Sequence, residues 1–445
     1  MNKLVIFLLA AIGLVGCKGK VDDKVEEPSL ITWSECGYEI GDHICNLTLK
    51  DQLGNDFDLY ENVGRPIILD YSTMWCGYCG LAAQEVDDVS EKYREYDLLY
   101  VTLLIENQYD LNSFYVGATL NHKQLNTPVE DLFLSEFTYS TPENCSKQAQ
   151  IHPSPGVWRW KKFEDYLEFA NKNNITLRVH GPISPQASKW AKNDSRTKKE
   201  LSTNMNEFFT ALCIKVNEEP SVKWMDVVNE TVNRDGSWFA EKPGDEKWEN
   251  PWTQIGLNED GIPIYIVRAF EIANQFAPNV SLVYNQHAGM ESVMWEKILQ
   301  TILYLKQKGL RVDGIGWQAH LKDFEDLALN KGKLDYLASL IDWTHANGMD
   351  FHVTEMDYRI KEDPPTNKSL QRQSAAYSNV LKVLISRKDS GVVTFNTWGM
   401  IDRPGSHTNG YRFLFDKNLK PKPALFAFKR TLIKKETSLI LEKND

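Results

Sequence analysis

Two glutamates lie at the carboxyl ends of apolar segments, in Asp226-Val-Val-Asn-Glu230 and in Thr354-Glu355-Met-Asp357. When such segments are parallel strands of one sheet, the polar residues at their carboxyl ends lie at the same edge of the sheet. A pair of carboxyl groups placed there can cleave a glycosidic bond. One serves as a protonated acid for the leaving oxygen and the other as a carboxylate for the anomeric carbon. The alternative is that both glutamates form ordinary surface ion pairs.

The elements that would position these residues alternate along the chain from residue 113 onward. Eight apolar strands are expected, at Ser113–Leu120, Glu136–Glu143, Thr176–Gly181, Val222–Glu230, Ser281–Asn285, Asp313–Leu321, Asp350–Asp357 and Val392–Gly399. Amphipathic helices are expected between them, at Trp158–Asn171, Lys198–Val216, Pro263–Phe276, Ser292–Lys308, Leu334–Asn347 and Leu370–Arg387. This alternation predicts an α/β fold, a (β/α)8 TIM barrel, over residues 111–434. Glu230 and Glu355 would then end the fourth and seventh strands, across the barrel mouth from one another.

Four motifs resemble those of glycoside hydrolase family 10, the retaining endo-β-1,4-xylanase family. They are Phe137-Thr-Tyr-Ser-Thr-Pro-Glu-Asn144, Trp224-Met-Asp-Val-Val-Asn-Glu230, Gly314-Ile-Gly-Trp-Gln-Ala-His-Leu321 and His352-Val-Thr-Glu-Met-Asp357. The resemblance spans roughly residues 114–430. It implies a retaining endo-β-1,4-glycosidase, in the first place an endo-β-1,4-xylanase, with a polysaccharide as its substrate.

The resemblance also implies roles for individual residues. Glu230 would be the general acid/base and Glu355 the nucleophile, with Glu355 ionised while Glu230 starts protonated. Asn229 would hold the 2-hydroxyl of the sugar. His320 and Asp357 would keep Glu355 ionised, and Gln318 would also reach the neighbourhood of Glu355. The remaining sugar contacts, on the glycone side, would come from Glu143, Asn144, Lys147, His180 and Trp398.

Two loops on the glycone side depart from the family pattern. The chain reads His180-Gly-Pro-Ile-Ser-Pro-Gln-Ala-Ser-Lys-Trp190, which lacks the family's usual Trp and second His; Gln186 would stand in for the family's Gln. After Trp398, the loop Asp402-Arg-Pro-Gly-Ser-His407 supplies polar groups in place of a second Trp. These changes leave the choice of sugar open. A decorated, anionic β-glycan is an alternative substrate, and a glycan-binding lipoprotein without turnover is an alternative function.

Three tryptophans follow the fourth predicted strand, at Trp238, Trp248 and Trp252. Their indoles could stack on the leaving-group side of a polysaccharide. The alternative is that they hold a long loop in place.

A smaller α/β unit is expected at residues 33–110. The strand Pro66–Tyr71, Trp75-Cys-Gly-Tyr-Cys79, a helical stretch and the strand Leu98–Ile105 resemble the first half of a thioredoxin fold. At a helix amino terminus Cys76 would be a nucleophilic thiolate and Cys79 would resolve the mixed disulfide. An inert disulfide between the two is the alternative. A bridge between Cys36 and Cys45 is possible, and Cys145 and Cys213 are expected to be buried singletons or an accidental pair.

Residues 1–17 resemble a bacterial lipoprotein signal. Lys3 precedes an apolar run, and Leu14-Val-Gly-Cys17 implies cleavage before Cys17 and lipidation of its thiol. Residues 18–32 are charged and predict a solvated tether. The mature protein is therefore expected to be exported and lipid-anchored at the bacterial outer membrane, on its periplasmic or cell-surface face. An ordinary secretory signal is the alternative.

Composition limits the other partners. The chain has 50 Lys and Arg against 61 Asp and Glu, and its net charge of −11 argues against a nucleic-acid binder. Hydrophobic residues make up 42%, as in ordinary folded domains. The sequence has neither a phosphate-binding glycine loop nor zinc-spaced His and Cys residues, so no cofactor and no metal is expected. Residues 435–445 predict a polar tail, and the oligomeric state is left open.

Overall fold

The chain divides into two units, Met1–Asp110 and Leu111–Asp445. The structure, a computed structural model, describes residues 43–44, 46–50, 55–72, 92–104, 114–193, 196–240, 250–322, 327–403 and 410–442. Within these ranges no helix is long and apolar enough to cross a membrane.

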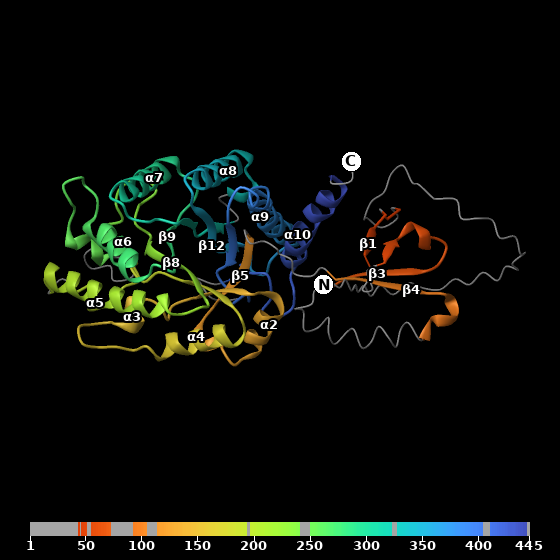
Figure 1. Ribbon diagram of the computed structural model, residues 1–445, viewed down its shortest axis with the longest axis horizontal. Helices are drawn as coiled ribbons and strands as arrows, with labels where there is room; N and C mark the ends of the chain where they lie inside the picture. The colour runs from red at the N-terminus through yellow and green to blue at the C-terminus, as the bar shows by residue number, and fades with distance from the viewer. Residues whose placement is uncertain are drawn as a thin grey trace, which may run out of the picture. The chain divides into compact units, whose positions relative to one another are not determined.

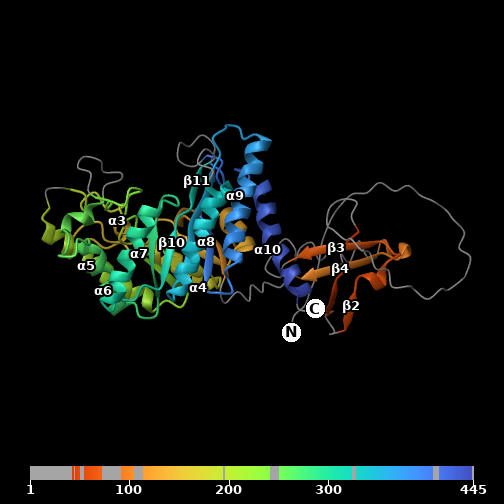
Figure 2. The same cartoon turned by 90° about the horizontal axis from the view of Figure 1, so that it is seen from above.

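Parallel strands of the larger unit close into a barrel, which Figures 1 and 2 show from two directions. In the described residues the eight strands of the barrel are β5 (Phe114–Leu120), β6 (Tyr139–Pro142), β7 (Thr176–Val179), β8 (Val222–Asn229), β9 (Ser281–Gln286), β10 (Gly314–Trp317), β12 (Asp350–Arg359) and β13 (Val393–Thr397). The ring closes because β10 pairs with β12 and β13 pairs with β5. The predicted (β/α)8 barrel is confirmed.

Helices cover the outside of the barrel (Figure 1). They are α2 (Pro128–Glu136), α3 (Gln148–Ile151), α4 (Lys161–Lys172), α5 (Lys198–Asn217), α6 (Ile264–Phe276), α7 (Ser292–Gln307), α8 (Lys331–Ala346), α9 (Asn367–Ile385) and α10 (Pro423–Glu442). Local sequence fixes their ends and faces. α5 starts after Thr197, which forms a capping box with Glu200, and it buries one face that includes Met205 and Phe208.

Many predicted element ends shift by one to three residues in the structure, and the differences at Glu136, at 313–321 and at the carboxyl end are the most informative. The strand expected from Glu136 is shorter, because Glu136 ends α2 and β6 begins only at Tyr139. The strand expected at 313–321 is split into β10 and a short β11 (His320–Lys322), since Ala319 adopts a positive φ of 57° that interrupts the extended backbone. At the carboxyl end α10 continues to Glu442, into the segment that was expected to be a polar tail.

Both cysteines of the larger unit are buried and free. Cys213 lies on the buried face of α5, and Cys145 lies in the loop after β6. Burial raises the pKa of the Cys145 thiol to about 12, so it stays protonated and unreactive at neutral pH. Of the two alternatives, buried singletons is therefore the correct one.

Gly117 marks a close approach between the first two barrel strands. A Cβ atom built on Gly117 would overlap the backbone carbonyl and the ring of Tyr139 on β6. Gly117→Ala is expected to lower the free energy of unfolding by about 1–3 kcal/mol, because a well-packed interior has no room for an added methyl group. Urea unfolding would measure this change. Gly410→Ala is the matched control, since nothing lies within 4 Å of a Cβ atom there. Equal stability of the two variants would contradict the prediction.

The smaller unit contains two described strand pairs. β1 (Thr48–Lys50) pairs antiparallel with β2 (Asp56–Asp58), and β3 (Ile67–Ser72) pairs in parallel with β4 (Leu99–Leu104). β3 and β4 lie where two strands were expected. The segment between them that carries Cys76 and Cys79 is outside the described residues, as are Cys36, Cys45, the signal with Cys17, and the tether. The thioredoxin-like and lipoprotein interpretations therefore stay predictions.

Candidate active site

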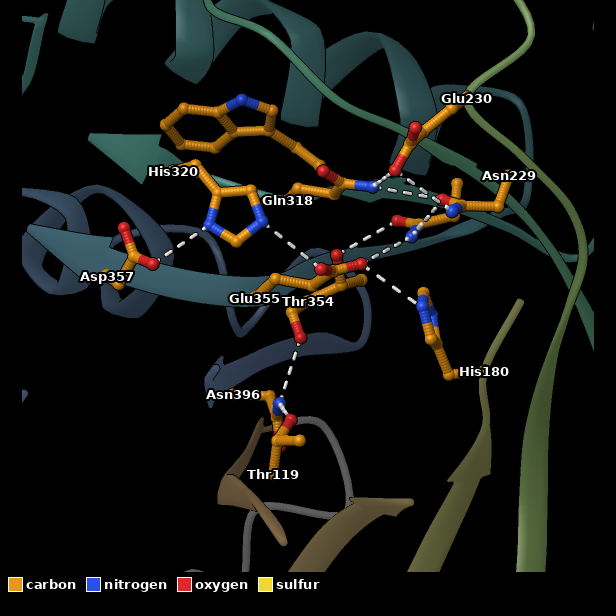
Figure 3. A network of polar contacts seen from close by, with 12 residues as sticks. Thr119, His180, Asn229, Glu230, Gln318, His320, Thr354, Glu355, Asp357 and Asn396 are labelled. Carbon is orange, nitrogen blue, oxygen red and sulfur yellow. Dashed lines mark hydrogen bonds and ion pairs between the residues drawn. The ribbon is translucent and has the colours of Figure 1, made fainter. Parts of the chain in front are cut away.

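The two glutamates lie at the same mouth of the barrel, in one network of polar contacts (Figure 3). Glu355 belongs to β12, and Glu230 follows the last residue of β8. Glu230 adopts a positive φ of 58°, and its backbone N–H donates to the Asn285 carbonyl at 3.2 Å. This turn ends the strand and keeps the Glu230 side chain at the mouth. Both side chains are buried, with only 9% of Glu230 and 3% of Glu355 exposed.

Glu355 is surrounded by hydrogen-bond donors and positive charge. Nε2 of His320 lies 3.2 Å from Oε2 of Glu355, and Nδ1 of His180 lies 3.6 Å from Oε1. Asn285 donates from Nδ2 to Oε1 at 3.2 Å. Burial alone would raise the pKa of Glu355, but attraction to His180, the hydrogen bond and charge of His320, and the charge of Arg178 together lower it to about 2. Glu355 is therefore ionised at neutral pH.

His320 connects Glu355 to a second carboxylate. Its Nδ1 lies 3.1 Å from Oδ2 of Asp357, and the same oxygen accepts from Nη1 of Arg412 at 2.9 Å. Burial opposes protonation of His320, but the charges and hydrogen bonds of Asp357 and Glu355 raise its pKa to about 10. His320 is therefore an imidazolium that donates to both carboxylates, as sequence reasoning placed it.

A buried ion pair lies beneath His180. Arg178 contacts Asp226, and Oδ2 of Asp226 lies 2.8 Å from Nδ1 of His180. Arg178 also donates to the backbone carbonyl of Thr354 at 2.8 Å, next to Glu355. Sequence reasoning gave no role to Arg178, in the third predicted strand, or to Asp226, in the motif that ends at Glu230. For Arg178 one signal was available: it lies two residues before His180, and residues two apart on a strand face the same side.

Glu230 lies among amide groups. Gln318 donates from Nε2 to Oε1 of Glu230 at 3.0 Å and to Oδ1 of Asn229 at 3.1 Å. Nδ2 of Asn229 lies 3.3 Å from Oε1 of Glu230, and Nε2 of Gln186 lies 3.4 Å from both of its carboxyl oxygens. Gln318 was expected to reach the neighbourhood of Glu355; its hydrogen bonds go to Glu230 and Asn229, which shares the donor Asn285 with Glu355. Gln186 does occupy the site, as its place in the sequence indicated.

Asn285, which sequence reasoning left without a role, joins the two glutamate environments. Its Nδ2 donates to Oδ1 of Asn229 at 2.9 Å as well as to Glu355, and its Oδ1 accepts from Thr354 at 2.9 Å. With Oδ1 of Asn229 accepting from both Asn285 and Gln318, the amide of Asn229 has a single orientation. Its Nδ2 donor group therefore faces the mouth beside Glu230.

The predicted glycone-side residues gather on the neighbouring strand ends. Nζ of Lys147 donates to Oδ1 of Asn144 at 3.1 Å and lies 6.0 Å from the ring centroid of Trp398. The Trp398 ring packs edge-on against His180, with centroids 4.8 Å apart. Glu143 accepts from Asn121 at 2.8 Å. Burial lowers the pKa of Lys147, while the charges of Glu355, Glu230 and Glu143 counteract that effect. These residues form one polar cluster that includes the Trp398 ring.

The site geometry agrees with a family assignment from sequence comparison. The model of glycosyl hydrolase family 10 matches residues 105–431. The chain belongs to glycosyl hydrolase family 10. Among its curated relatives, endo-1,4-beta-xylanase A of Caldicellulosiruptor saccharolyticus is 30% identical over 337 residues, covering 71% of this chain and 93% of the relative. The beta-1,4-xylanase of Dictyoglomus thermophilum is 29% identical over 331 residues, covering 70% and 87%.

Solved structures of the family superpose on the barrel. Native xylanase 10B from Thermotoga maritima gives a TM-score of 0.63 at 28% identity, covering 74% of this chain and 97% of that one. Xylanase 10B from Thermotoga petrophila, solved in complex with xylobiose, gives 0.62 at 26% identity, with 74% and 96% covered. The family 10 match therefore covers the barrel and excludes nearly all of the smaller unit.

The loop at residues 402–407, which departs from the family pattern, is partly described by the structure. Asp402 does not face the mouth: it is buried, pairs with Nζ of Lys422 at 2.7 Å and accepts from the backbone N–H of Phe413 at 2.9 Å. Residues 404–409, with His407, lie outside the described residues, and the Arg403 backbone N–H donates to Gly410 at 3.2 Å. Asp402 thus fixes the base of this loop and does not supply a sugar contact.

The tryptophans after β8 have different surroundings. Trp252 is fully buried in η4 (Pro251–Ile255) and donates from Nε1 to the Ser184 carbonyl at 2.9 Å, so it holds the loop in place. Trp238 is half-buried; its Nε1 donates to Gly261 at 3.0 Å, and Nζ of Lys297 lies 4.6 Å from its ring centroid. Trp248 lies outside the described residues. The loop-holding alternative is correct for Trp252.

The contacts of His320 predict the acid limit of activity. His320→Gln removes a positive charge and a charged donor from Glu355, so the pKa of Glu355 should rise from about 2 toward the ordinary value of 4.5. A nucleophile must be ionised, and the acid limb of kcat/KM should therefore move upward by about 1–2 pH units. A pH profile on a soluble glycan would measure it. His122→Gln, at a half-buried histidine paired with Asp165, is the control. An unmoved acid limb in His320→Gln would refute the role of His320.

Proposed function

We propose that this family 10 enzyme is a retaining endo-β-1,4-xylanase, with Glu355 as nucleophile and Glu230 as general acid/base. The observation that carries the proposal is the contrast between the two glutamates. Glu355 is held ionised by His320, His180 and Arg178, whereas Glu230 contacts only neutral amide groups among the side-chain contacts described for it. Such a contrast assigns an acid and a nucleophile to a pair of carboxyl groups.

In the first step a carboxylate oxygen of Glu355 bonds to the anomeric carbon, the glycosidic bond breaks, and the leaving oxygen takes the proton of Glu230. Glu355 becomes a neutral ester and Glu230 a carboxylate. In the second step Glu230 takes a proton from water while the water oxygen bonds to the anomeric carbon and releases Glu355. Each step inverts the anomeric centre, so the product has the configuration of the substrate.

The amide network assists both steps. Asn229 is oriented by Asn285 and Gln318, so its Nδ2 group is available to the sugar hydroxyl next to the reacting carbon. Such a contact strengthens as positive charge develops on the sugar ring. Gln318 donates to Glu230 in a geometry suited to the carboxylate that forms in the first step. We propose Glu143, Asn144, Lys147, His180 and Trp398 as contacts to the sugar on the glycone side.

Xylan is the substrate that the relatives support. Release of reducing ends would be measured from β-1,4-xylans, other plant β-glycans and algal polysaccharides, with the full chain in mild detergent. Release from xylan is the expected result. Release from another glycan alone would replace xylan with that substrate and direct attention to the 181–190 and 402–407 loops. Tight binding without release from any glycan would favour the glycan-binding alternative.

We also propose that the enzyme is exported and lipid-anchored through Cys17. This proposal is supported by the Leu14-Val-Gly-Cys17 pattern after an apolar run. Labelled palmitate fed to an expressing bacterium should enter the wild-type chain and not the Cys17→Ser variant. Equal labelling of both would contradict the anchor.

A further inference from the structure

The line that joins Glu230 to Glu355 divides the barrel mouth into two sides. On one side lie the ends of β7, β6, β5 and β13, which carry the proposed glycone contacts. On the other side lie the ends of β9 and β10, the two strands between β8 and β12. If the sugar that is transferred occupies the first side, as the proposed function requires, the departing sugar occupies the second. His287 directly follows β9 on this second side.

The hydrogen bonds of Gln286 fix the proton on His287. Oε1 of Gln286 accepts from the backbone N–H groups of Thr231 at 3.0 Å and Val232 at 3.4 Å, so this atom is the amide oxygen. Nε2 of Gln286 then donates to the Val232 carbonyl at 2.7 Å and faces Nδ1 of His287 at 3.1 Å. Because an amide N–H can only donate, Nδ1 of His287 accepts and has no proton. The ring proton of His287 is on Nε2.

The His287 ring is held in this orientation and stays neutral. Phe239, from the segment after β8, packs against it with ring centroids 5.6 Å apart. Burial lowers the pKa of His287; the negative charge of Glu230 counteracts this, and the positive charge of His320 adds to it. Protonation would also set two donors, Nδ1 of His287 and Nε2 of Gln286, against each other. Across the described residues, Nε2 of His287 has no hydrogen-bond partner.

We propose that His287 is a specificity-determining residue on the leaving-group side, whose Nε2–H donates a hydrogen bond to the departing sugar. The inference rests on the proposed function. Its carrying observation is a preorganised donor, the Nε2–H group of His287, on the half of the mouth opposite the glycone contacts. A donor fixed in advance loses little freedom when substrate binds, and a site built around one hydrogen bond discriminates strongly against a group that cannot form it.

The test compares leaving groups in the full chain. His287→Phe keeps a ring against Phe239 and removes the donor, and His287→Gln offers an amide donor in its place. The same variants and His122→Phe, a control outside the mouth network, are assayed for kcat/KM on xylotetraose and on 4-nitrophenyl β-xylobioside. The second substrate has a nitrophenyl group where the first has a departing sugar.

His287→Phe should lose 10- to 100-fold in kcat/KM on xylotetraose and no more than about twofold on the aryl glycoside, and His287→Gln should recover part of the loss. An equal loss on both substrates would show a structural effect and overturn the inference, and so would no loss on either. If the wild-type enzyme cleaves another β-glycan and neither xylan substrate, only the proposed substrate is overturned. The His287 variants are then compared on an oligosaccharide and an aryl glycoside of that glycan. Inactivity on every β-glycan would overturn the proposed function and this inference together.

Discussion

Replacing Glu355 with alanine should lower kcat on xylan by about 10⁴- to 10⁶-fold, because the first step then has no nucleophile. The side chain is buried in a pocket of donors, and its removal leaves space between His320, His180 and Asn285. A small anion could enter that space. Azide should therefore restore turnover of an aryl xylobioside with a good leaving group, and the product should be the glycosyl azide of inverted configuration.

The anomeric configuration of that product distinguishes a nucleophile from a residue needed for folding. Glu164→Ala is the matched control, since this glutamate lies on α4 and pairs with Lys215 on the barrel's exterior. It should retain wild-type kcat. Activity of Glu355→Ala within tenfold of wild type, in a folded protein, would remove Glu355 from the mechanism. A rescued product of retained configuration would assign the nucleophile's role elsewhere.

Replacing Glu230 with alanine should give a loss that depends on the leaving group. On xylan, whose departing hydroxyl needs a proton, kcat/KM should fall by about 10²- to 10⁴-fold. On 4-nitrophenyl β-xylobioside, whose leaving oxygen is stable as an anion, kcat/KM should change little, while kcat should fall because the second step lacks its base. Hydrolysis rates of the two substrates, measured side by side, would show this difference.

Azide should give products of opposite anomeric configuration in the Glu230→Ala and Glu355→Ala variants. In Glu230→Ala the covalent intermediate still forms on Glu355, so azide should attack it and give the glycosyl azide of retained configuration. Asn229, Gln318 and Gln186 would remain around the vacated position and could accommodate the anion. An equal loss on xylan and on the aryl glycoside would contradict the acid/base role of Glu230.

The barrel and its two glutamates were predictable because the signals that carry them are local in sequence. Each strand is a short apolar run, and the two glutamates each follow or end such a run in a recognisable motif. The departures arise where backbone geometry changes within a run. The positive φ at Ala319 splits one expected strand, and the proximity of α2 shortens another.

The interior of the site was less predictable because its contacts join distant segments. Asn285 bonds to Asn229 and Glu355, which are 56 and 70 positions away. The hydrogen bond of Gln318 to Glu230 depends on how β10 is placed between its neighbours. Arg178 and Asp226 are charges inside an apolar barrel, and a pattern of apolar residues gives no reason to expect them. The pairing of such groups requires the folded geometry.

The order of strands around the barrel has a consequence for the protein's synthesis. The first strand, β5, pairs on one side with β6 and on the other with the last strand, β13, where Ala118 lies opposite Thr397. About 280 residues separate β5 from that partner, which at 5–20 residues per second is roughly 14–56 s of translation. Throughout this interval the edge of the nascent sheet has unpaired backbone N–H and C=O groups, which can pair with strands of other chains. A chaperone or an export factor that keeps the chain unfolded until β13 has emerged would protect it, and truncation before Val393 should yield aggregates in place of a smaller enzyme.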